Sequence, residues 1–261
     1  MAVQDEPGWQ DATVMRRSDR SMRAFASRQL RDLPPGRRLR LRLALEAIED
    51  RFGGEPNLRL LDAGSEEGLL CLELARRHPG WLLVAADIAV RPLQRGLRLA
   101  RTEGLQVSYL AWDLQRKLAE SSFDAVAALE SLVEIPDDQA AMATMAAALG
   151  PGGLFLVQVP TADWTPALRG AERTWRREAR HGYEHGELVA GLEGLGLQVQ
   201  KVTPTFRRTV ALAQDVRDRL RPRGRYTQLA LLPLMAAAVA LERAGLTWGP
   251  PRALFVVAVK R

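Results

Sequence analysis

Four acidic residues follow four successive apolar segments of the chain, and their spacing suggests ligand chemistry. The segments and their acids are "LRLLD" with Asp62, "WLLVAAD" with Asp87, "QVSYLAWD" with Asp113, and "FDAVAAL" with Glu130 shortly after it. Carboxylates in such a series can accept hydrogen bonds from the hydroxyl and amino groups of a polar ligand. Each aspartate alone could equally be a loop residue, because Asp is common at strand ends. Four acids in register favour one shared binding site.

A glycine turn follows the first of these acids. A strand that feeds a tight turn and then a helix presents unpaired backbone N–H groups and the positive end of the helix dipole. Gly64 would let a ligand approach the backbone, and Gly68 would let the helix pack close to the strand. Glu66 stands where a third glycine is expected. Its charge would interact with a ligand charge about 4 Å away by roughly 4 kcal/mol, so geometry decides whether it helps or hinders binding.

The elements that must position these residues alternate regularly along the chain. Apolar segments bounded by turn residues predict strands, and the intervening segments predict helices. This alternation predicts an α/β fold: a Rossmann-like, doubly wound, seven-stranded, mostly parallel sheet, with its ligand at the carboxyl ends of the strands. The expected strands are 58–62, 81–87, 106–113, 123–129, 154–160, 197–202 and 253–260, and the helices between them are 66–78, 90–103, 137–149 and 185–194.

The chain divides into a core and two additions. The core is expected over 55–202, with 253–261 as its last strand, and N-terminal helices over 1–54 form a cap. In that cap, apolar residues recur at helical spacing and stop at a Gly-Gly pair. Residues 203–252 form a helical insertion before the last strand, with helices expected at 210–221 and 228–244.

Several motifs of the core resemble one enzyme family. Asp62-Ala-Gly64-Ser-Glu66-Glu-Gly68 resembles D-x-G-x-G-x-G, the first motif of class I S-adenosylmethionine-dependent methyltransferases of the small-molecule type. "WDL" (112–114), "FDAVAALESLVEIPDD" and the "LGPGG" turn resemble later motifs of that family, in the same order. The resemblance covers 55–202 and the last strand. It implies S-adenosylmethionine as the cofactor and methyl transfer to a small acceptor.

The resemblance also assigns the cofactor residues. It implies that Asp87 binds the ribose hydroxyls, that Asp113 meets the adenine amino group, and that Glu130 lies in the loop after the fourth strand. Glu66 departs from the family pattern and puts the affinity for the cofactor in question. The residues assigned to the cofactor are Asp62, Gly64, Ser65, Glu66, Gly68, Asp87, Ile88, Trp112, Asp113, Leu114 and Glu130.

Methyl transfer requires positioning of the partners and exclusion of water, and a weakly acidic acceptor also needs a base. His181, Tyr183, His185 and Glu134 are the candidates, and Glu134 stands where the family often has histidine. Both histidines could instead be ordinary residues of a loop and a helix start. No metal site is predicted, because a single cysteine excludes cysteine-based zinc clusters.

Arginine is concentrated in two places of a chain whose net charge is +6. Residues 15–45 hold ten arginines and two aspartates, and 206–226 hold seven arginines and two aspartates. Solvated helix faces are the simplest explanation. An anionic partner is the other, and an arginine-rich segment beside the apolar stretch 229–241 suits an anionic membrane surface. The insertion is therefore expected either to cap the substrate, which would suit a lipophilic or aromatic acceptor, or to lie on a membrane.

Other functions fit the sequence less well. A degenerate methyltransferase-like binding protein is the main alternative, and Glu66 is its support. The sequence disfavours nucleic-acid methylation. "ESLVEIPD" lacks the D/N-P-P-Y/F-type motif of enzymes that methylate exocyclic base nitrogens, and Cys71, the one cysteine that could serve pyrimidine C5 methylation, is expected among core residues. The glycine spacing also disfavours an NAD(P)-dependent oxidoreductase. The chain begins without a secretory signal and has no apolar run long enough to cross a bilayer. We therefore expect a cytoplasmic protein, which would be peripheral to a membrane if the insertion binds one.

Overall fold

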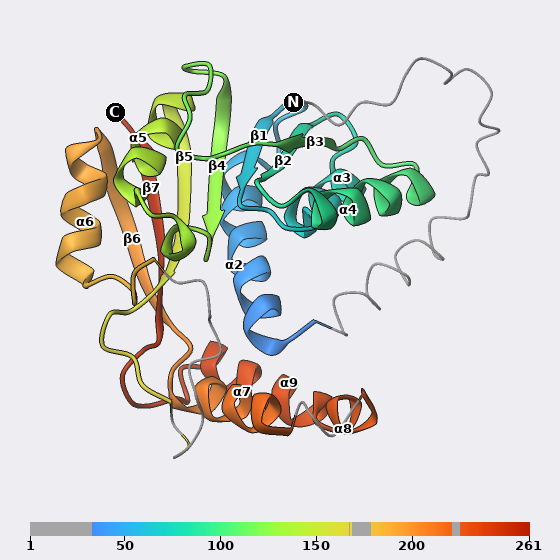
Figure 1. Ribbon diagram of the computed structural model, residues 1–261, viewed down its shortest axis with the longest axis vertical. Helices are drawn as coiled ribbons and strands as arrows, with labels where there is room; N and C mark the ends of the chain where they lie inside the picture. The colour runs from blue at the N-terminus through green and yellow to red at the C-terminus, as the bar shows by residue number, and fades with distance from the viewer. Residues whose placement is uncertain (1–32, 167, 169–178, 221–224) are drawn as a thin grey trace.

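The computed structural model describes residues 33–166, 168, 179–220 and 225–261 (Figure 1). Most of the predicted N-terminal cap, residues 1–32, lies outside the described residues. Seven strands form one sheet in the order β3-β2-β1-β4-β5-β7-β6. The strands are β1 (Arg59–Ala63), β2 (Leu82–Asp87), β3 (Ser108–Ala111), β4 (Phe123–Leu129), β5 (Leu149–Pro160), β6 (Leu197–Thr205) and β7 (Ala253–Lys260).

The strand pairing confirms the predicted seven-stranded, mostly parallel sheet. Strands β1 to β5 are parallel to one another, whereas β7 runs antiparallel to both β5 and β6. The chain moves outward from β1 to β3 and then returns to place β4 on the other side of β1. The carboxyl ends of β1 and β4 therefore diverge at a switch point, where open α/β sheets bind their ligands.

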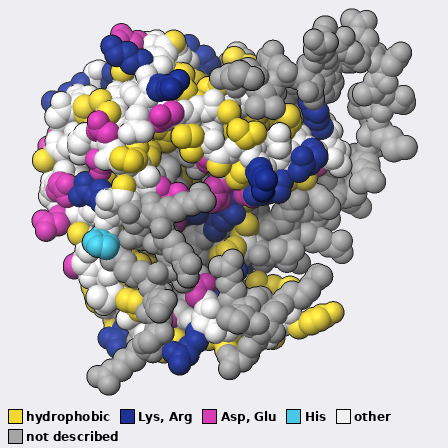
Figure 2. Space-filling view, in the orientation of Figure 1, with side chains coloured by type: hydrophobic (Ala, Val, Ile, Leu, Met, Phe, Trp, Pro, Cys, Tyr) yellow, Lys and Arg dark blue, Asp and Glu magenta, His cyan; other side chains and the backbone are white. Residues whose placement is uncertain are grey.

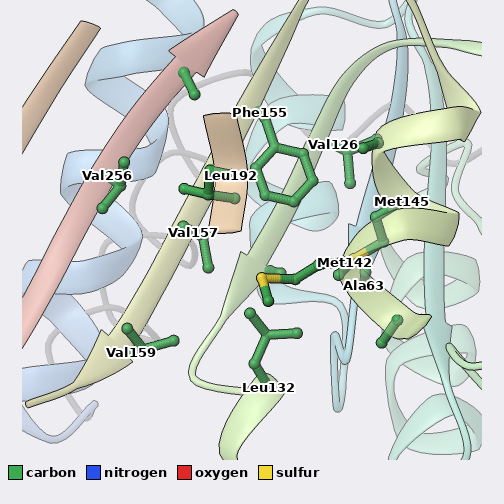
Figure 3. Close-up of a cluster of buried hydrophobic side chains, with 14 of the residues drawn as sticks. Ala63, Val126, Leu132, Met142, Met145, Phe155, Val157, Val159, Leu192 and Val256 are labelled. Carbon is green, nitrogen blue, oxygen red and sulfur yellow. The ribbon is translucent and has the colours of Figure 1, made fainter. Parts of the chain in front are cut away.

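Helices cover both faces of the sheet, as the alternation predicted. Apolar side chains of α2, α3 and α4 pack on one face, and those of α5 and α6 pack on the other. Figure 3 shows the second core, where Met142 and Met145 of α5 meet Phe155 and Val157 of β5. The helices of the two faces are α2 (Pro35–Phe52), α3 (Leu69–Arg77), α4 (Val90–Glu103), α5 (Asp138–Ala148) and α6 (His185–Gly194), and a short 3₁₀ helix, η1 (Leu132–Glu134), follows β4.

The insertion forms a third layer, beyond the carboxyl ends of β4 and β5 in Figure 1. It consists of α7 (Arg208–Leu220), α8 (Arg225–Ala230) and α9 (Leu232–Arg243). Its small core joins Val210 of α7, Met235 and Val239 of α9, and Leu39 of α2. Helix α2 thus packs against the sheet and against the insertion.

Several predicted boundaries were wrong. Strand β5 begins at Leu149 rather than 154, so the "LGPGG" turn is its start, and β3 is shorter than the predicted 106–113. Helix α3 begins at Leu69 rather than 66, because Glu66 and Gly68 have φ angles of +51° and +69°, which no α-helix contains. Strand β6 continues to Thr205, past the predicted end at 202. The helix predicted over 228–244 is divided at Leu231 into α8 and α9, and Pro233 lies in the first turn of α9, where its missing N–H is tolerated.

Candidate functional site

A cavity of about 400 Å³ lies at the carboxyl ends of β1 to β4, at the switch point of the sheet. Acidic and basic side chains lie next to each other near the centre of the face in Figure 2. Among the described residues, six carboxylates and two guanidinium groups line the cavity. The charged residues are Asp62, Glu66, Asp87, Asp113, Glu130, Glu134, Arg37 and Arg40.

The glycine turn after β1 is tightly packed from behind. A Cβ atom on Gly64 would lie 2.2 Å from Cβ of Ser131, and the φ angle of Gly64 is +76°. Ser131 is fixed there by a hydrogen bond from its hydroxyl to the Ala63 carbonyl oxygen, 3.0 Å away. Only glycine suits this position, for steric reasons and because of the backbone angle.

The N–H groups of the turn differ from the expectation of unpaired donors. Those of Gly64 and Ser65 both donate to the Ala86 carbonyl oxygen of β2. The N–H of Glu66 donates to Oδ2 of Asp87 at 2.8 Å, and the N–H of Ala89 donates to Oδ1 of the same carboxylate at 2.8 Å. The turn therefore positions Asp87. Each carboxylate oxygen of Asp87 retains a lone pair for a ligand hydroxyl.

The outer end of the cavity combines apolar walls with a fixed carboxylate. Trp112 and Ile88 line it, and Ile88 is 71% exposed, unusual for so large an apolar side chain. Oδ1 of Asp113 accepts hydrogen bonds from the backbone N–H and the side-chain amide of Gln115. The hydrogen bond from the backbone N–H of Gln115 is the main cause of the lowered pKa of Asp113. Apolar side chains beside a fixed carboxylate suit a flat ring that carries a hydrogen-bond donor.

Helix α2 contributes a wall that the motifs did not indicate. Arg37 pairs with Glu66 at 2.5 Å and with Glu67 at 2.8 Å, and Glu67 also pairs with Arg95 of α4. Glu66 thus holds a left-handed backbone conformation while its side chain is drawn to Arg37.

A second pair, Arg40–Glu130, joins α2 to the loop after β4. Both of its side chains are less than a fifth exposed. Nothing local in the sequence marks Arg37 or Arg40, because their role depends on how α2 packs. The arginine cluster at 15–45 was the only signal, and solvated faces were its simplest explanation.

Asp62 is the most perturbed acid of the site. Burial, followed by the negative charge of Asp87, raises its pKa to about 7, and the opposing effects of Arg40 and Arg37 are smaller. A carboxyl group in this state can exchange a proton near neutral pH. A positive ligand nearby would favour its ionised form.

The structure brings ten of the eleven residues predicted for the cofactor to the lining of this one cavity. The exception is Gly68, which lies behind the turn, where an added Cβ would be 2.8 Å from the Cβ of Ala85. Gly68 therefore allows the close packing of helix and strand that the sequence suggested. That the ten residues bind the cofactor remains a prediction.

The four candidate bases are not brought together. Glu134 lines the cavity, at the end of η1. Tyr183 is buried outside the lining of the cavity, and its hydroxyl donates a hydrogen bond to Asp138. Burial is the main cause of the raised pKa of Tyr183. His181 and His185 are exposed, and neither is among the described residues that line the cavity.

Comparison with known families decides the identity of the core. Residues 23–202 match the model of a methyltransferase-domain family. The chain belongs to this methyltransferase family. It is an S-adenosylmethionine-dependent enzyme of the small-molecule type, and the predicted family and cofactor are confirmed.

Individual relatives agree with this assignment. The chain is 28% identical over 163 residues to the ubiquinone biosynthesis O-methyltransferase of Escherichia coli O6:H1, covering 60% of this chain and 67% of the relative. It is 35% identical over 174 residues to the enzyme of that name from Xanthomonas axonopodis pv. citri, covering 61% and 70%. Matches to several other relatives cover 65% of their length, so the similarity spans about two thirds of these proteins.

Solved structures support the fold. The [4+2]-cyclase SpnF superposes with a TM-score of 0.61 at 20% identity, covering 84% of this chain and 80% of that one. The phosphoethanolamine N-methyltransferase 2 of Haemonchus contortus, in complex with S-adenosyl-L-methionine, has a TM-score of 0.60 at 17% identity, covering 83% and 51%.

The residues of the cavity fit this cofactor. The buried hydroxyl of Ser65 lines the cavity and has no hydrogen-bond partner in the structure, which leaves a donor for the polar end of a ligand. In the described lining, the excess of carboxylates over guanidinium groups suits a ligand with sulfonium and ammonium charges. The apolar end formed by Trp112 and Ile88 suits its aromatic ring.

Proposed function

We propose that this methyltransferase methylates a hydroxyl group on a lipophilic, aromatic acceptor. The relatives named O-methyltransferases support oxygen as the acceptor atom. The observation that carries the cofactor half of the proposal is the single cavity lined by Asp62, Asp87, Asp113 and Glu130. The cofactor supplies an electrophilic methyl group on a sulfonium sulfur.

The residues of the chain would divide the work of binding. Asp87, aligned by two backbone N–H groups, would accept the ribose hydroxyls, and Asp113 would accept the adenine amino group. Ser65 would donate to the methionine carboxylate. The buried Arg40–Glu130 pair would exclude water beside the acceptor.

Glu134 is the base that we propose, because it is the one candidate of the four that lines the cavity among the described residues. Its carboxylate would take the proton of the acceptor hydroxyl as the oxygen attacks. A carboxylate is a weak base, so the acceptor should carry an acidic hydroxyl, and phenols are more acidic than alkyl alcohols.

The first experiment measures binding of S-adenosylhomocysteine by calorimetry. We expect micromolar affinity that falls at least about tenfold in Asp87→Ala, because two ribose hydrogen bonds to a charged group are lost. Asp124→Ala is the matched control, since Asp124 follows the start of β4, outside the cavity, and pairs with Arg59. No binding at millimolar ligand would favour a degenerate domain instead.

The second experiment identifies the acceptor atom. Label transfer from methyl-labelled cofactor is compared for an alkyl catechol, its dimethyl ether and the matching alkyl aniline. We expect label in the catechol alone, and a fall in kcat of about a hundredfold in Glu134→Gln with unchanged cofactor affinity. Label in the aniline would overturn O-methylation.

A lipophilic acceptor would be held in a membrane. We therefore also propose that the protein makes a peripheral contact with an anionic membrane. No helix among the described residues is long and apolar enough to cross a bilayer.

A further inference from the structure

Helix α9 has an apolar surface on the side that faces away from the protein. Its inward side chains, among them Met235, Ala238 and Val239, are buried in the small core of the insertion. A helix that is apolar all round is normally buried on all sides. Yet between Leu232 and Leu241 every exposed residue is apolar: Pro233, Leu234, Ala236, Ala237, Ala240 and Leu241.

Large exposed apolar side chains also precede and follow α9 in the chain. Tyr226 and Leu229 of α8 are 81% and 46% exposed. Leu246 and Trp248, which follow α9, are 65% and 61% exposed. In Figure 2, hydrophobic side chains project from the lower right edge, where Figure 1 places α8. Tyrosine and tryptophan are the side chains enriched at the boundary between lipid and water.

The loop that carries Trp248 joins the surface to α7. The N–H of Arg208 donates to the Trp248 carbonyl oxygen at 3.0 Å, and the hydroxyls of Thr209 and Thr247 lie 2.8 Å apart. Along α7, Arg208, Leu212 and Arg219 are exposed, at spacings that place them on one side of the helix. We call the exposed residues of α7, α8, α9 and the following loop the insertion face.

The charges of the insertion face all have one sign. Among the described residues of 206–250, the exposed charged side chains are Arg208, Arg219 and Arg243. The acids of this region are buried or only partly exposed, and Arg243 pairs with the exposed Glu46 of α2 at 3.4 Å. Asp215 pairs with Arg252 and Glu242 accepts the N–H groups of Phe206 and Arg207, while Asp218 is only partly exposed.

We propose that the insertion face is a docking surface for an anionic lipid bilayer. Apolar side chains would enter the interface while the arginines meet lipid phosphates, as in other interfacial helices. The charge pattern disfavours a symmetric dimer through this face, because a two-fold contact would bring the arginines of one copy toward those of the other. The bilayer is the occupant that complements both the apolar area and the charge.

The position of the insertion face relates it to the cavity. Helix α2 contributes Arg37 and Arg40 to the cavity and Leu39 to the core of the insertion. The insertion also lies beyond the carboxyl ends of β4 and β5, the same side of the sheet as the cavity (Figure 1). A docked bilayer would therefore lie near the site. The idea that docking brings a lipophilic acceptor to the cavity rests on the proposed function, but the docking itself does not.

Vesicle flotation of the full chain tests the docking without any acceptor. We expect the protein to float with phosphatidylcholine vesicles that contain roughly a third phosphatidylglycerol, and at least about tenfold less with phosphatidylcholine alone. Salt at about 0.5 M should weaken the binding, because the charge contribution is screened. Flotation that is absent, or equal for both kinds of vesicle, would overturn the proposal.

Two sets of variants locate the surface. Leu234→Ser, Leu241→Ser and Trp248→Ser combined should reduce flotation about tenfold or more. The matched control is Leu82→Ser with Val90→Ser, which changes exposed apolar side chains on the core. It should float like the unchanged protein, and an equal loss in the control would overturn the location.

The charge set replaces Arg208 and Arg219 by glutamine, with Arg91→Gln and Arg98→Gln on α4 as the control. We expect about tenfold weaker flotation for the first pair and less than a twofold change for the second. Binding of S-adenosylhomocysteine should stay unchanged in every variant, which separates this proposal from the proposed function. Sedimentation that shows a dimer dissociated by the apolar triple variant, without lipid binding, would assign the face to a second copy and overturn the bilayer.

Discussion

The cofactor cavity and the insertion face use charge in opposite ways. Of the residues that the structure describes, six carboxylates and two guanidinium groups line the cavity, and both guanidinium groups are paired with acids. The described part of the insertion face exposes arginine and no acid. The first region suits a ligand with positive charge, and the second suits an anionic surface. The modest net charge of the whole chain therefore conceals two local environments of opposite sign.

The two regions also differ in how they are held in place. The cavity depends on close backbone packing between the turn after β1 and the loop after β4. The insertion depends on a small core and on a few buried polar links such as Asp215–Arg252. We therefore expect substitutions to damage one region without the other.

The largest effect should come from Gly64→Ala. The new Cβ would overlap Ser131 at 2.2 Å, and the φ angle of +76° adds strain. We expect a loss of at least about 4 kcal/mol in the free energy of unfolding, measured with urea, and loss of cofactor binding. Gly104→Ala is the control, because Gly104 has a φ of +67° but open space around it. It should lose only about 1 kcal/mol, and equal losses would contradict the steric explanation.

The next largest effect should come from Asp215→Ala, in the insertion. This change leaves the guanidinium of Arg252 buried, since both side chains of the pair are at most 12% exposed. We expect a loss of about 3 kcal/mol in the free energy of unfolding, with cofactor affinity within about twofold. Asp218→Ala, which removes a partly exposed acid, should cost less than about 1 kcal/mol. A large loss of cofactor affinity in Asp215→Ala would show that the two regions are not independent.

A smaller, pH-dependent effect should come from Asp62→Asn, in the cavity. Because the pKa of Asp62 is raised to about 7, the folded protein holds a proton there that the unfolded chain has already released. Stability is therefore lost as the pH rises through the window from about 4 to about 7. Between about pH 5 and pH 8, the unchanged protein should lose about 2–3 kcal/mol relative to Asp62→Asn.

Asp113→Asn is the matched control for this pH dependence. Hydrogen bonds from Gln115 lower the pKa of Asp113, so its ionisation is complete below the same pH window. The stability difference between Asp113→Asn and the unchanged protein should therefore stay constant between about pH 5 and pH 8. If Asp62→Asn behaved in the same flat way, its carboxyl group would not be perturbed by burial.

The smallest effect should come from Glu66→Gly. Glycine would relieve the strain of the left-handed backbone at φ +51°, which stabilises the fold by about 1 kcal/mol. It would also remove the half-exposed ion pair with Arg37, which costs at most about 1 kcal/mol of stability. We expect stability within about 1 kcal/mol and affinity for S-adenosylhomocysteine within about fivefold. Glu66→Gln is the comparison, because it keeps the side chain and removes the charge. A change of more than about tenfold in affinity would make Glu66 a direct ligand of the cofactor.

Much of the fold could be read from local patterns. Apolar segments and turn residues predicted each of the seven strands, because burial on both faces and tight turns restrict residue type. The ends of the elements were predicted less accurately. Helix α3 starts three residues after its predicted start, because Glu66 adopts a left-handed conformation that is usual for glycine. In this conformation the Glu66 side chain pairs with Arg37. That pairing comes from a distant helix and has no local signature.

Residue type and spacing were sufficient to predict the order of the strands along the chain and the acids that follow β1 to β4. The packing of distant elements places Arg37 and Arg40 at the cavity and puts Glu134, unlike Tyr183, in its lining. It also decided which side of α9 remains exposed. The physical reason is that burial and ion pairing depend on the packing of elements far apart in sequence, and an apolar helix has the same pattern whether its second side is covered or free.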